Sequence, residues 1–323
     1  MDLIYTDANR TDLGALSAYS LDMSFGASEN DFTVMLDKNA VRLETKAAVY
    51  IESTEYGGLV DFLKTATASD KITYAGRTWH GILNSKVIQP DAGAAYLIVS
   101  GDANSILSVL VDRLGLSGLF VVAETASGVN ISRYQFPRYC KGYDGIRAML
   151  AKNGAKLKME WDAEAKAVRL SAVPLVDYSA EPVDGDEANL NIERHETKVN
   201  HLICLGRGEL ADREVIHLYC DHAGQIGRTQ FYTGVDEVVE IYENTAAESV
   251  EDLESGGLSR FAELRNNDKA EIDLQEGVGR AYDIGDIVGA KDVLTGIGVS
   301  AAVSQKIVRI NNGVISTEYK TGG

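Results

Sequence analysis

The residues most able to bind a metal are two cysteines and two histidines that lie close together in the sequence. They are Cys204, His217, Cys220 and His222. Thiolate sulfur and imidazole nitrogen suit zinc, and four such ligands can close a structural site. On a β-strand, however, successive side chains alternate between faces, so His217 and Cys220 are expected on opposite sides. Only Cys220 and His222 share a face unless the chain bends. The pattern therefore favours buried thiols and surface histidines, and we predict neither a metal nor a cofactor.

A pair of carboxylates, Asp283 and Asp286, flanks Gly285 just before an apolar run. Two carboxylates at close spacing could act as a general acid and base or bind a cation. Catalytic pairs, however, usually come from different elements that face each other across a cleft. Acidic residues in front of a strand more often form turns. We therefore predict a turn at this position and no catalytic residue.

Two glycine pairs, Gly206-Arg207-Gly208 and Gly277-Val278-Gly279, could suggest a phosphate-binding loop. Both lack the third glycine of a dinucleotide-binding fingerprint, and neither separates a strand from a helix in a βαβ unit. A Gly-x-Ser-x-Gly nucleophile elbow is also missing from the sequence. The motifs therefore do not predict an enzyme.

The length, the net charge and the apolar runs of the chain restrict the class of protein further. A chain of 323 residues is long for one core, so two or three domains are expected. Its 48 acidic and 31 basic residues give a net charge of −17, which disfavours sequence-specific nucleic-acid binding and contact with anionic lipid. No apolar run approaches the ~18 residues that a membrane-spanning helix needs, so we expect no stable membrane insertion.

The three cysteines, Cys140, Cys204 and Cys220, are widely spaced and odd in number. This pattern indicates reduced thiols rather than a disulfide framework, as expected for a protein made in a cytoplasm. The first residues also lack the basic region and apolar run of a signal peptide. We therefore expect a protein made in a cytoplasm.

The elements that must position these residues are mostly strands. At the C-terminal end, Asn311-Asn312-Gly313 separates two apolar runs, which is a strong hairpin signal because a type I′ turn needs positive φ at both central residues. With Asn312 and Gly313 as the loop, three cross-strand pairs follow, and together with the run after Gly285 the segment should form a three-stranded meander. The expected pairs are Ile310 with Ile315, Val308 with Thr317, and Lys306 with Tyr319.

The N-terminal 90 residues alternate apolar and polar side chains, as in Leu21–Phe25 and Phe32–Leu36, which predicts strands with one buried face. The run Ile72–Trp79 suggests a hairpin that turns at Ala75-Gly76. A further strand is expected over Ile82–Ile88.

Helical periodicity begins after residue 90. Asp102 or Asn104 can cap a helix whose apolar face includes Ile106 to Leu114, and a second helix is expected over Tyr143–Asn153. Another helix is expected over 247–266, where a break at Gly256-Gly257 is plausible because each glycine costs about 1 kcal/mol relative to alanine. We therefore predict three domains: a β-domain over 1–90, an α+β module over 91–188, and a second β-domain over 189–323 that contains the helix near 247–266.

Several runs, taken in order, resemble one family. They are Gly76-Arg77-Thr78-Trp79-His80-Gly81-Ile82-Leu83, Gly101-Asp102-Ala103-Asn104 before a helix, Asn200–Leu210, the helix of Ala247–Leu264 and Gly285-Asp286-Ile287-Val288. Together they span nearly the whole chain, although none is a short diagnostic motif. The sequence is similar in this way to baseplate hub proteins of phage tails, which also occur in tail-like bacteriocins and defective prophages of Gram-positive bacteria.

The resemblance implies a β-rich α+β fold with two tail-tube-like antiparallel β-barrel or sandwich domains around an α+β middle module. It implies a homotrimer that presents six similar β-domains and joins a sixfold tail tube to a threefold spike. Its partners would be the tail tube protein, the spike protein and other baseplate subunits. It would be assembled in the bacterial cytoplasm, and its mature location would be the tail tip, or baseplate, of a virion or of a phage-tail-like particle such as a contractile injection system; whether the tail contracts is left open. Such hubs offer no catalytic residues to carry over.

A second hypothesis from a different class is a cell-envelope hydrolase or a glycan-binding tail-tip protein. It would be favoured by a cleft that holds two carboxylates at catalytic separation. A metal bound at Cys204, Cys220 and His222 would favour it as well.

Overall fold

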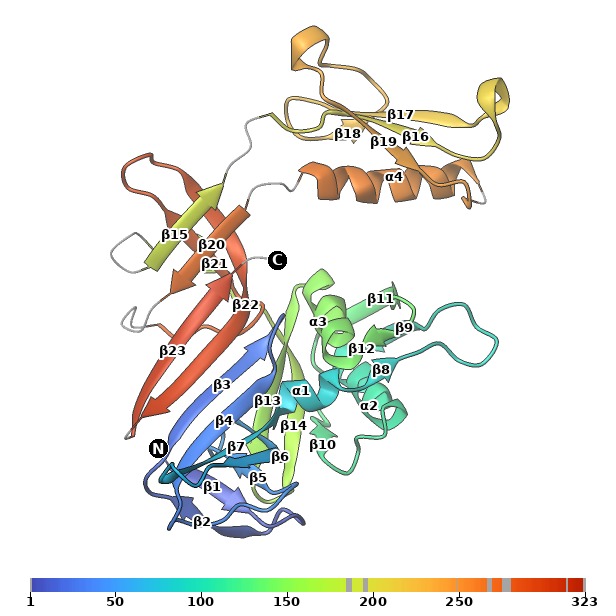
Figure 1. Cartoon of the computed structure of the whole chain (residues 1–323). Helices are drawn as coiled ribbons and strands as arrows, with labels where there is room; N and C mark the ends of the chain where they lie inside the picture. The colour runs from blue at the N-terminus through green and yellow to red at the C-terminus, as the bar shows by residue number, and fades with distance from the viewer. Residues whose placement is uncertain are drawn as a thin grey trace. The chain divides into compact units, whose positions relative to one another are not determined.

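The computed structural model describes residues 2–183, 188–193, 197–247, 249–265, 269–274, 280–311 and 313–321. Its contacts divide the chain into a large unit, residues 1–190 with 271–323, and a small unit, residues 191–270. The elements of both units are labelled in Figure 1. This division differs from the one expected from the sequence, because strands near the C-terminus pair with strands near the N-terminus.

The large unit is built on a twelve-stranded sheet. The alternation of residues 21–25 and 32–36 does form strands whose apolar side chains face a core. The order along the sheet is β15-β20-β23-β22-β3-β4-β7-β6-β5-β1-β2, with β21 paired to β22. The strands are β1 (Leu3–Thr6), β2 (Asp12–Leu16), β3 (Ser20–Gly26), β4 (Asp31–Asp37), β5 (Ala48–Tyr50), β6 (Gly57–Thr65), β7 (Lys71–Thr78), β15 (Ala188–Glu193), β20 (Lys269–Leu274), β21 (Ile287–Lys291), β22 (Gly298–Asn311) and β23 (Val314–Thr321).

The closing hairpin has the predicted register, with Ile310 opposite Ile315, Val308 opposite Thr317 and Lys306 opposite Tyr319. Gly313 has a φ of +78°, whereas Asn312 lies outside the described residues. The predicted meander is confirmed in its three strands, but β22 also pairs along its second half with β3. The hairpin is therefore part of the large sheet rather than a separate one.

Two hydrophobic cores lie along this sheet. The first is formed by strands of the N-terminal region together with Val308 and Ile310 of β22. The second is formed by residues of 183–190, 272–290 and 299–319, and Val303 contributes to it from the first half of β22. Because β22 is 14 residues long, it contributes to both cores.

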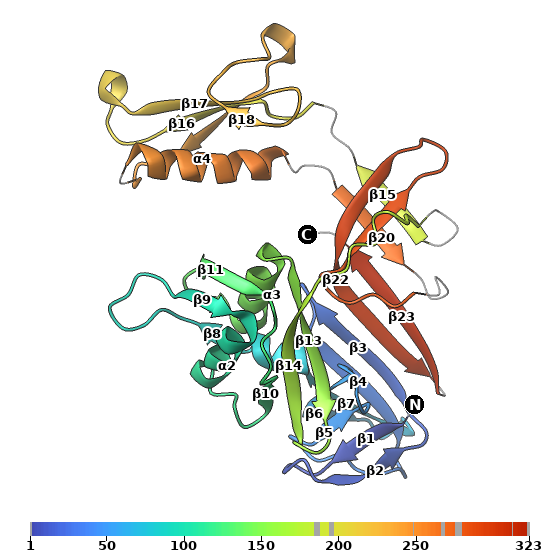
Figure 2. The same cartoon turned by 180° about the vertical axis from the view of Figure 1, so that it is seen from behind.

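A third core belongs to the middle module, whose helices pack around the β13–β14 hairpin (Figures 1 and 2). Asp102 caps α2 as predicted, because its Oδ1 accepts the Asn104 amide proton at 2.9 Å. Trp161 of β13 stacks on Tyr50 and on Trp79, which joins the module to the N-terminal sheet. The elements are α1 (Trp79–Asn84), β8 (Val87–Ile88), β9 (Ile98–Asp102), α2 (Ala103–Arg113), β10 (Phe120–Val122), β11 (Asn130–Gln135), β12 (Cys140–Lys141), α3 (Gly142–Lys152), β13 (Ala155–Asp162) and β14 (Ala167–Pro174).

Two predictions about the N-terminal region are wrong. Strand β7 runs through Ala75-Gly76 without turning, because Gly76 lies where β6 approaches too closely for a side chain: a Cβ there would be 1.9 Å from the Leu59 carbonyl oxygen. The expected strand over 82–88 is instead α1 followed by the short β8. The hydroxyl of Thr78 accepts the amide proton of Gly81 and starts the helix.

The small unit consists of a four-stranded sheet in the order β18-β17-β16-β19, with α4 along one face (Figure 1). Leu202 and Cys204 of β16, and Ile216, Leu218 and Cys220 of β17, face α4 and form its core. None of the described helices in either unit is long and apolar enough to cross a membrane. The elements are β16 (His201–Leu205), β17 (Val215–Cys220), β18 (Ile226–Gly227), β19 (Val239–Glu243) and α4 (Val250–Arg265).

The predicted break at Gly256-Gly257 is wrong, because α4 continues through both glycines. A Cβ on Gly257 would lie 2.5 Å from the Cys204 sulfur, and one on Gly256 would lie 2.5 Å from the Tyr242 hydroxyl. The glycines therefore allow close packing of the helix on the sheet. Their helix-propensity cost is offset by that packing.

Candidate functional site

The four cysteine and histidine residues that zinc could have bound lie in different places in the small unit: the two cysteines on one face of its sheet, His217 on the other, and His222 beyond the end of β17. Cys204 and Cys220 are buried against α4, and burial raises the pKa of both thiols above its ordinary value. His217 lies on the opposite face, as the strand alternation predicts, and His222 follows the end of β17. Among the described residues, no group of three or more His, Cys, Asp or Glu side chains is arranged to hold a metal ion.

His217 instead belongs to a hydrogen-bonded chain of side chains that the sequence reasoning missed. Its Nδ1 lies 2.8 Å from Nε2 of His201, and Nδ1 of His201 lies 2.8 Å from a carboxylate oxygen of Glu237. A carboxylate only accepts, so His201 donates from Nδ1. When both rings are neutral, His201 then accepts at Nε2, and His217 donates from Nδ1 and presents an unprotonated Nε2.

These histidines lie on the sheet face opposite α4, which we call the open face. The strand register arranges it in three rows across β17, β16 and β19. Ile241, at the centre of β19, is 62% exposed, which is high for an apolar side chain in a sheet. Alternation along β16 and β17 could have indicated that His201 and His217 share this face. The rows are Tyr219–His201–Val239, His217–Ile203–Ile241 and Val215–Leu205–Glu243.

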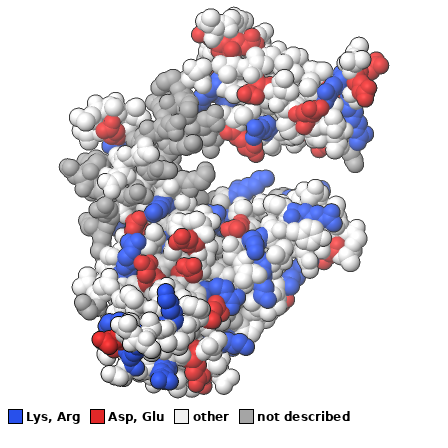
Figure 3. All heavy atoms as spheres, viewed as in Figure 1, with Lys and Arg blue, Asp and Glu red and all other residues white. Residues whose placement is uncertain are grey.

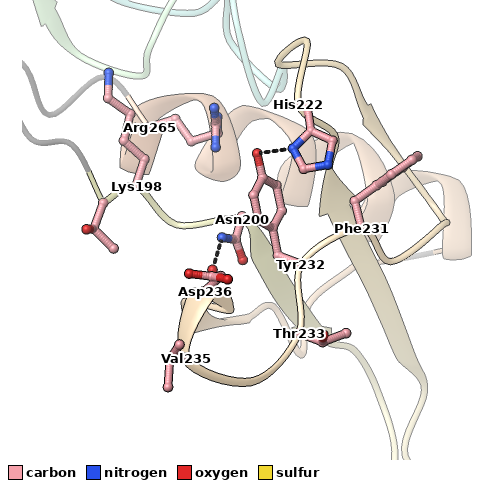
Figure 4. Close-up of a pocket in the computed structure, with 10 residues that line it drawn as sticks. Lys198, Asn200, His222, Phe231, Tyr232, Thr233, Val235, Asp236 and Arg265 are labelled. Carbon is pink, nitrogen blue, oxygen red and sulfur yellow. Dashed lines mark hydrogen bonds between the residues drawn. The ribbon is translucent and has the colours of Figure 1, made fainter.

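A pocket of about 450 Å³ also belongs to the small unit (Figure 4). His222 takes part in it through a 3.0 Å hydrogen bond between its Nδ1 and the Tyr232 hydroxyl. Asn200 is already used structurally, because it donates to the Asp236 carbonyl and accepts from the Val238 amide. Arg265 is also engaged, because it donates to the Val199 carbonyl, and the rings of Phe231 and Tyr232 give the lining an aromatic part. The lining residues are Thr197, Lys198, Asn200, His222, Phe231, Tyr232, Thr233, Val235, Asp236 and Arg265.

Asp283 and Asp286 meet a partner from the middle module of the large unit. Nζ of Lys156 lies 2.7 Å from Oδ2 of Asp283, and 2.7 and 2.8 Å from the two carboxylate oxygens of Asp286. The turn predicted here is confirmed by the hydrogen bond from the Asp286 amide to the Asp283 carbonyl. Asp286 also accepts the amide protons of Val176 and Asp283. Its carboxylate is thus occupied as a structural counter-ion.

Lys156 remains charged in this setting. Burial lowers its pKa, but the hydrogen bonds from Asp283 and Asp286 outweigh that effect, and the net pKa lies above the ordinary value of lysine. The side chains of Lys156 and Asp286 are only 8% and 2% exposed. This buried ion pair therefore joins β13 to the segment that leads into β21.

A second buried cation, Lys306 of β22, contacts Glu55 in the loop between β5 and β6. Its Nζ lies 2.8 Å from Oε1 of Glu55, and their side chains are 5% and 17% exposed. The ammonium group also lies over the rings of Tyr56 and Tyr319, 5.1 and 5.6 Å from their centroids. Burial lowers the pKa of Lys306, but Glu55 more than compensates, so the net shift is upward. This contact ties the C-terminal hairpin to the N-terminal region.

His80 of α1 lies next to this ion pair and is 2% exposed. Its ring stacks on Phe25 with centroids 4.5 Å apart, and its Nε2 is 3.7 Å from the second carboxylate oxygen of Glu55. Burial, and then the charge of Lys306, lower the pKa of His80 to about 3. His80 is therefore neutral near pH 7 and acts as a packing residue.

The surface of the molecule does not concentrate one sign of charge on the face seen in Figure 3. Lys and Arg side chains there are interspersed with Asp and Glu. The excess of negative charge given by the sequence is therefore not gathered into one field on this face.

Comparisons with known proteins find similarity in structure but not in sequence. No protein-family model matches the sequence, and no curated protein is similar to it in sequence. In structure, the chain is similar to a prophage tail protein from Listeria monocytogenes, with a TM-score of 0.58 and 11% identity over 100% of this chain and 94% of that one. It is similar to the 43 kDa tail protein of prophage MuSo2 from Shewanella oneidensis, with a TM-score of 0.57 and 12% identity over 99% and 98%.

A chain of the p2 virion baseplate in its activated conformation gives a TM-score of 0.52 and 9% identity over 100% of this chain and 99% of that one. The similarity thus covers both units and nearly the full length of each relative. The predicted β-rich α+β fold is confirmed, and so is the resemblance to phage tail proteins at the level of fold. This chain has the fold of phage and prophage tail proteins.

Proposed function

We propose that this chain is a structural baseplate hub of a phage tail or a phage-tail-like particle. The observation that carries the proposal is the full-length similarity in fold to tail proteins, one of which is a chain of a virion baseplate. A tail protein acts through shape and association, so a fold shared from end to end is the appropriate criterion. We propose no catalytic role for any residue.

The hub is proposed to be a homotrimer in which the two β-cores of each large unit serve as tail-tube-like domains. Three chains then present six similar β-modules to a sixfold tail tube and a threefold surface to the spike. Both cores contain side chains of the long strand β22, and this supports the arrangement because one continuous strand fixes the position of one core relative to the other. The sheet also ends in two edges, β2 and β15, and exposed edges are the usual means by which sheets extend across subunits.

The proposed partners are the tail tube protein, the spike protein and the other baseplate subunits, at the tip of the assembled particle. A hub must hold the tube and the spike in a fixed relative position, and the buried ion pairs of Lys156 and Lys306 would help to keep it rigid. Each joins segments that are distant in sequence and fixes them by charge as well as by packing. Such pairs favour one arrangement over others more than they add stability.

The test is reconstitution with the tail tube and spike proteins of the same particle. We expect the purified chain to form a ring-shaped trimer, alone or once a partner is added, and to bind both. Its mass is measured by light scattering and its symmetry by electron microscopy. A chain that stays monomeric and binds neither partner would contradict the proposal. Hydrolysis of bacterial cell wall in a zymogram would instead support the envelope-hydrolase alternative.

A further inference from the structure

The strand β19 is an edge of the small-unit sheet. It pairs in parallel with β16 through Val239 to Glu243, and none of the described residues pairs with its outer edge. Natural proteins usually protect an exposed edge with charged side chains, lysine above all, with proline or with a covering element. Strand β19 contains no lysine or proline, and its charged side chains are the acidic Glu240 and Glu243. Val239 and Ile241 are 43% and 62% exposed.

The stretch of sequence that contains β19 is acidic. Between Arg228 and Arg260 the sequence contains eight acidic residues and no lysine or arginine. Some of these carboxylates are compensated from outside the stretch: Glu243 by Arg213 and Glu254 by Arg228. Glu240, the second residue of β19, is exposed and forms no ion pair with a described residue. The edge therefore combines an apolar strip with uncompensated negative charge.

We propose that β19 is a docking site for an extended segment of another protein, which adds to the sheet as a fifth strand and carries lysine or arginine. The alternation of β19 defines the pattern of that segment. Val239 and Ile241 point to the open face, whereas Glu240 lies on the other side. In the docking segment, the side chains that point to the open face should therefore be apolar, and those that lie beside Glu240 should be basic.

A second copy of this chain is a poor occupant of the edge. Pairing two β19 strands would bring carboxylates of this acidic stretch close to one another, and like charges across strands destabilise a sheet. A basic partner strand would instead gain both the backbone hydrogen bonds and the charge pairing. Charge complementarity therefore selects a different protein as the partner.

Because main-chain hydrogen bonds supply much of the affinity in strand addition, a synthetic peptide can serve as the probe. We would use a labelled peptide of about nine residues, the length of an ordinary strand, in which valine and lysine alternate. Binding to the full chain is measured by fluorescence anisotropy and located by hydrogen exchange. We expect binding that weakens with added salt, with slower exchange of the β19 amide protons.

Two control peptides separate strand addition from simple charge attraction. A peptide of alternating valine and glutamate should not bind, and the valine–lysine peptide with proline replacing its central valine should lose most of its affinity at unchanged charge. On the protein, Glu240→Lys and Ile241→Asp should each weaken binding about tenfold or more. Glu124→Lys, which makes the same charge change at another exposed site, should leave binding unchanged.

Three results would overturn the proposal. They are no binding of the valine–lysine peptide, equal binding of its proline-containing form, and equal loss of binding in Glu124→Lys and Glu240→Lys. The two peptide comparisons use the unaltered chain, so they decide the matter even if a variant folds poorly. Failure here would leave the hub proposal standing, because trimer formation and binding to tube and spike are measured separately.

Discussion

Lys156 brings one positive charge into the interior beside Asp283 and Asp286, with only 8% of its side chain exposed. Lys156→Met keeps most of the side-chain volume but leaves the Asp286 carboxylate without its cation. Removing one partner of a buried ion pair costs about 3–5 kcal/mol, because the remaining charge is uncompensated. We expect Lys156→Met to lower the free energy of unfolding by about that amount, measured by urea denaturation.

The control lies two residues away on the same strand. Lys158 is 57% exposed and pairs with Glu160 at the surface, so Lys158→Met should change the free energy of unfolding by less than about 1 kcal/mol. Adding Asp286→Asn to Lys156→Met should recover part of the loss, since the buried carboxylate is then removed. Equal effects of the two lysine variants would show that the ion pair does not stabilise the fold.

His80 gives the protein a defined response to acid. Its pKa falls from 6.5 to about 3 on folding, first through burial and then through the charge of Lys306. Between these pH values the unfolded chain binds a proton at His80 and the folded chain does not, so stability falls as the pH is lowered from about 6.5 toward 3. This one residue accounts for about 3 kcal/mol of that loss by pH 4.

The measurement is the free energy of unfolding from pH 7 down to pH 4 for the unaltered chain and for His80→Phe, which keeps a ring stacked against Phe25. Over this range the free energy of unfolding of the unaltered chain should fall by about 3 kcal/mol relative to that of the variant, because the variant cannot bind the proton. Parallel curves for His80→Phe would contradict the assignment.

At this scale, the sequence predicts what is local. The turn at Asp283 to Asp286 and the cap at Asp102 follow from short-range hydrogen bonding, and both are present. The partner of Asp286 could not be predicted, since Lys156 is 130 positions away and only the tertiary fold brings it near. For the same reason His217 was considered with Cys220 rather than with His201, which lies on the neighbouring strand.

At the scale of elements, the structural role of glycine differs most from what the sequence predicts. Gly76 and the pair Gly256-Gly257 were interpreted as a turn and a helix break, because glycine destabilises regular structure when nothing else acts on it. In the folded chain each lies where another element approaches too closely for a side chain. By contrast, the hairpin of β22 and β23 was predicted correctly, because turn chemistry and strand alternation agree over one short stretch.

The helix α4 offers a direct test of this interpretation. Gly257→Ala gains about 1 kcal/mol in helix propensity but places a methyl group 2.5 Å from the Cys204 sulfur and 3.1 Å from the Leu218 side chain. Overpacking a core typically costs about 1–3 kcal/mol. We expect a net loss in the free energy of unfolding, measured by urea denaturation.

Gly256→Ala is the matched control, because its new methyl group meets the outer end of the Tyr242 side chain, which can move aside. It should be close to neutral or stabilising. Adding Cys204→Ala to Gly257→Ala should remove the overlap and recover stability relative to Gly257→Ala alone. A stabilised Gly257→Ala would mean that the helix can shift away from the sheet.

At the scale of the whole molecule, the connection that the sequence could not reveal is the pairing of β3 with β22. Each strand is recognisable by its own alternation, but their register joins Met23 to Val308 across most of the chain. The expected boundaries near residues 90 and 188 followed changes in local pattern, whereas compactness is decided by such long-range pairs. Sequence periodicity identifies the faces of strands but not their neighbours.

This pairing leads to a prediction about which parts of the chain fold without the others. Truncation after Lys291 removes β22 and β23, which leaves β4 as the one described strand that pairs with β3. It also leaves Glu55 without Lys306 and the first core without Val308 and Ile310. Replacement of residues 194–268 by a short glycine–serine turn removes the small unit but keeps its flanking strands β15 and β20, which are neighbours in the sheet. We expect the truncated chain to lose cooperative unfolding and the shortened chain to keep it.

Circular dichroism during urea denaturation measures both outcomes, with a sharp transition expected only for the shortened chain. The physical reason is that a core and a sheet edge are lost together in one case, while in the other the two units have separate cores. A cooperative transition of residues 1–190 in the truncated chain, followed apart from that of the small unit by hydrogen exchange, would show that these residues fold without β22 and β23. That result would also remove the support that the shared strand β22 gives to a hub of two rigidly coupled β-modules.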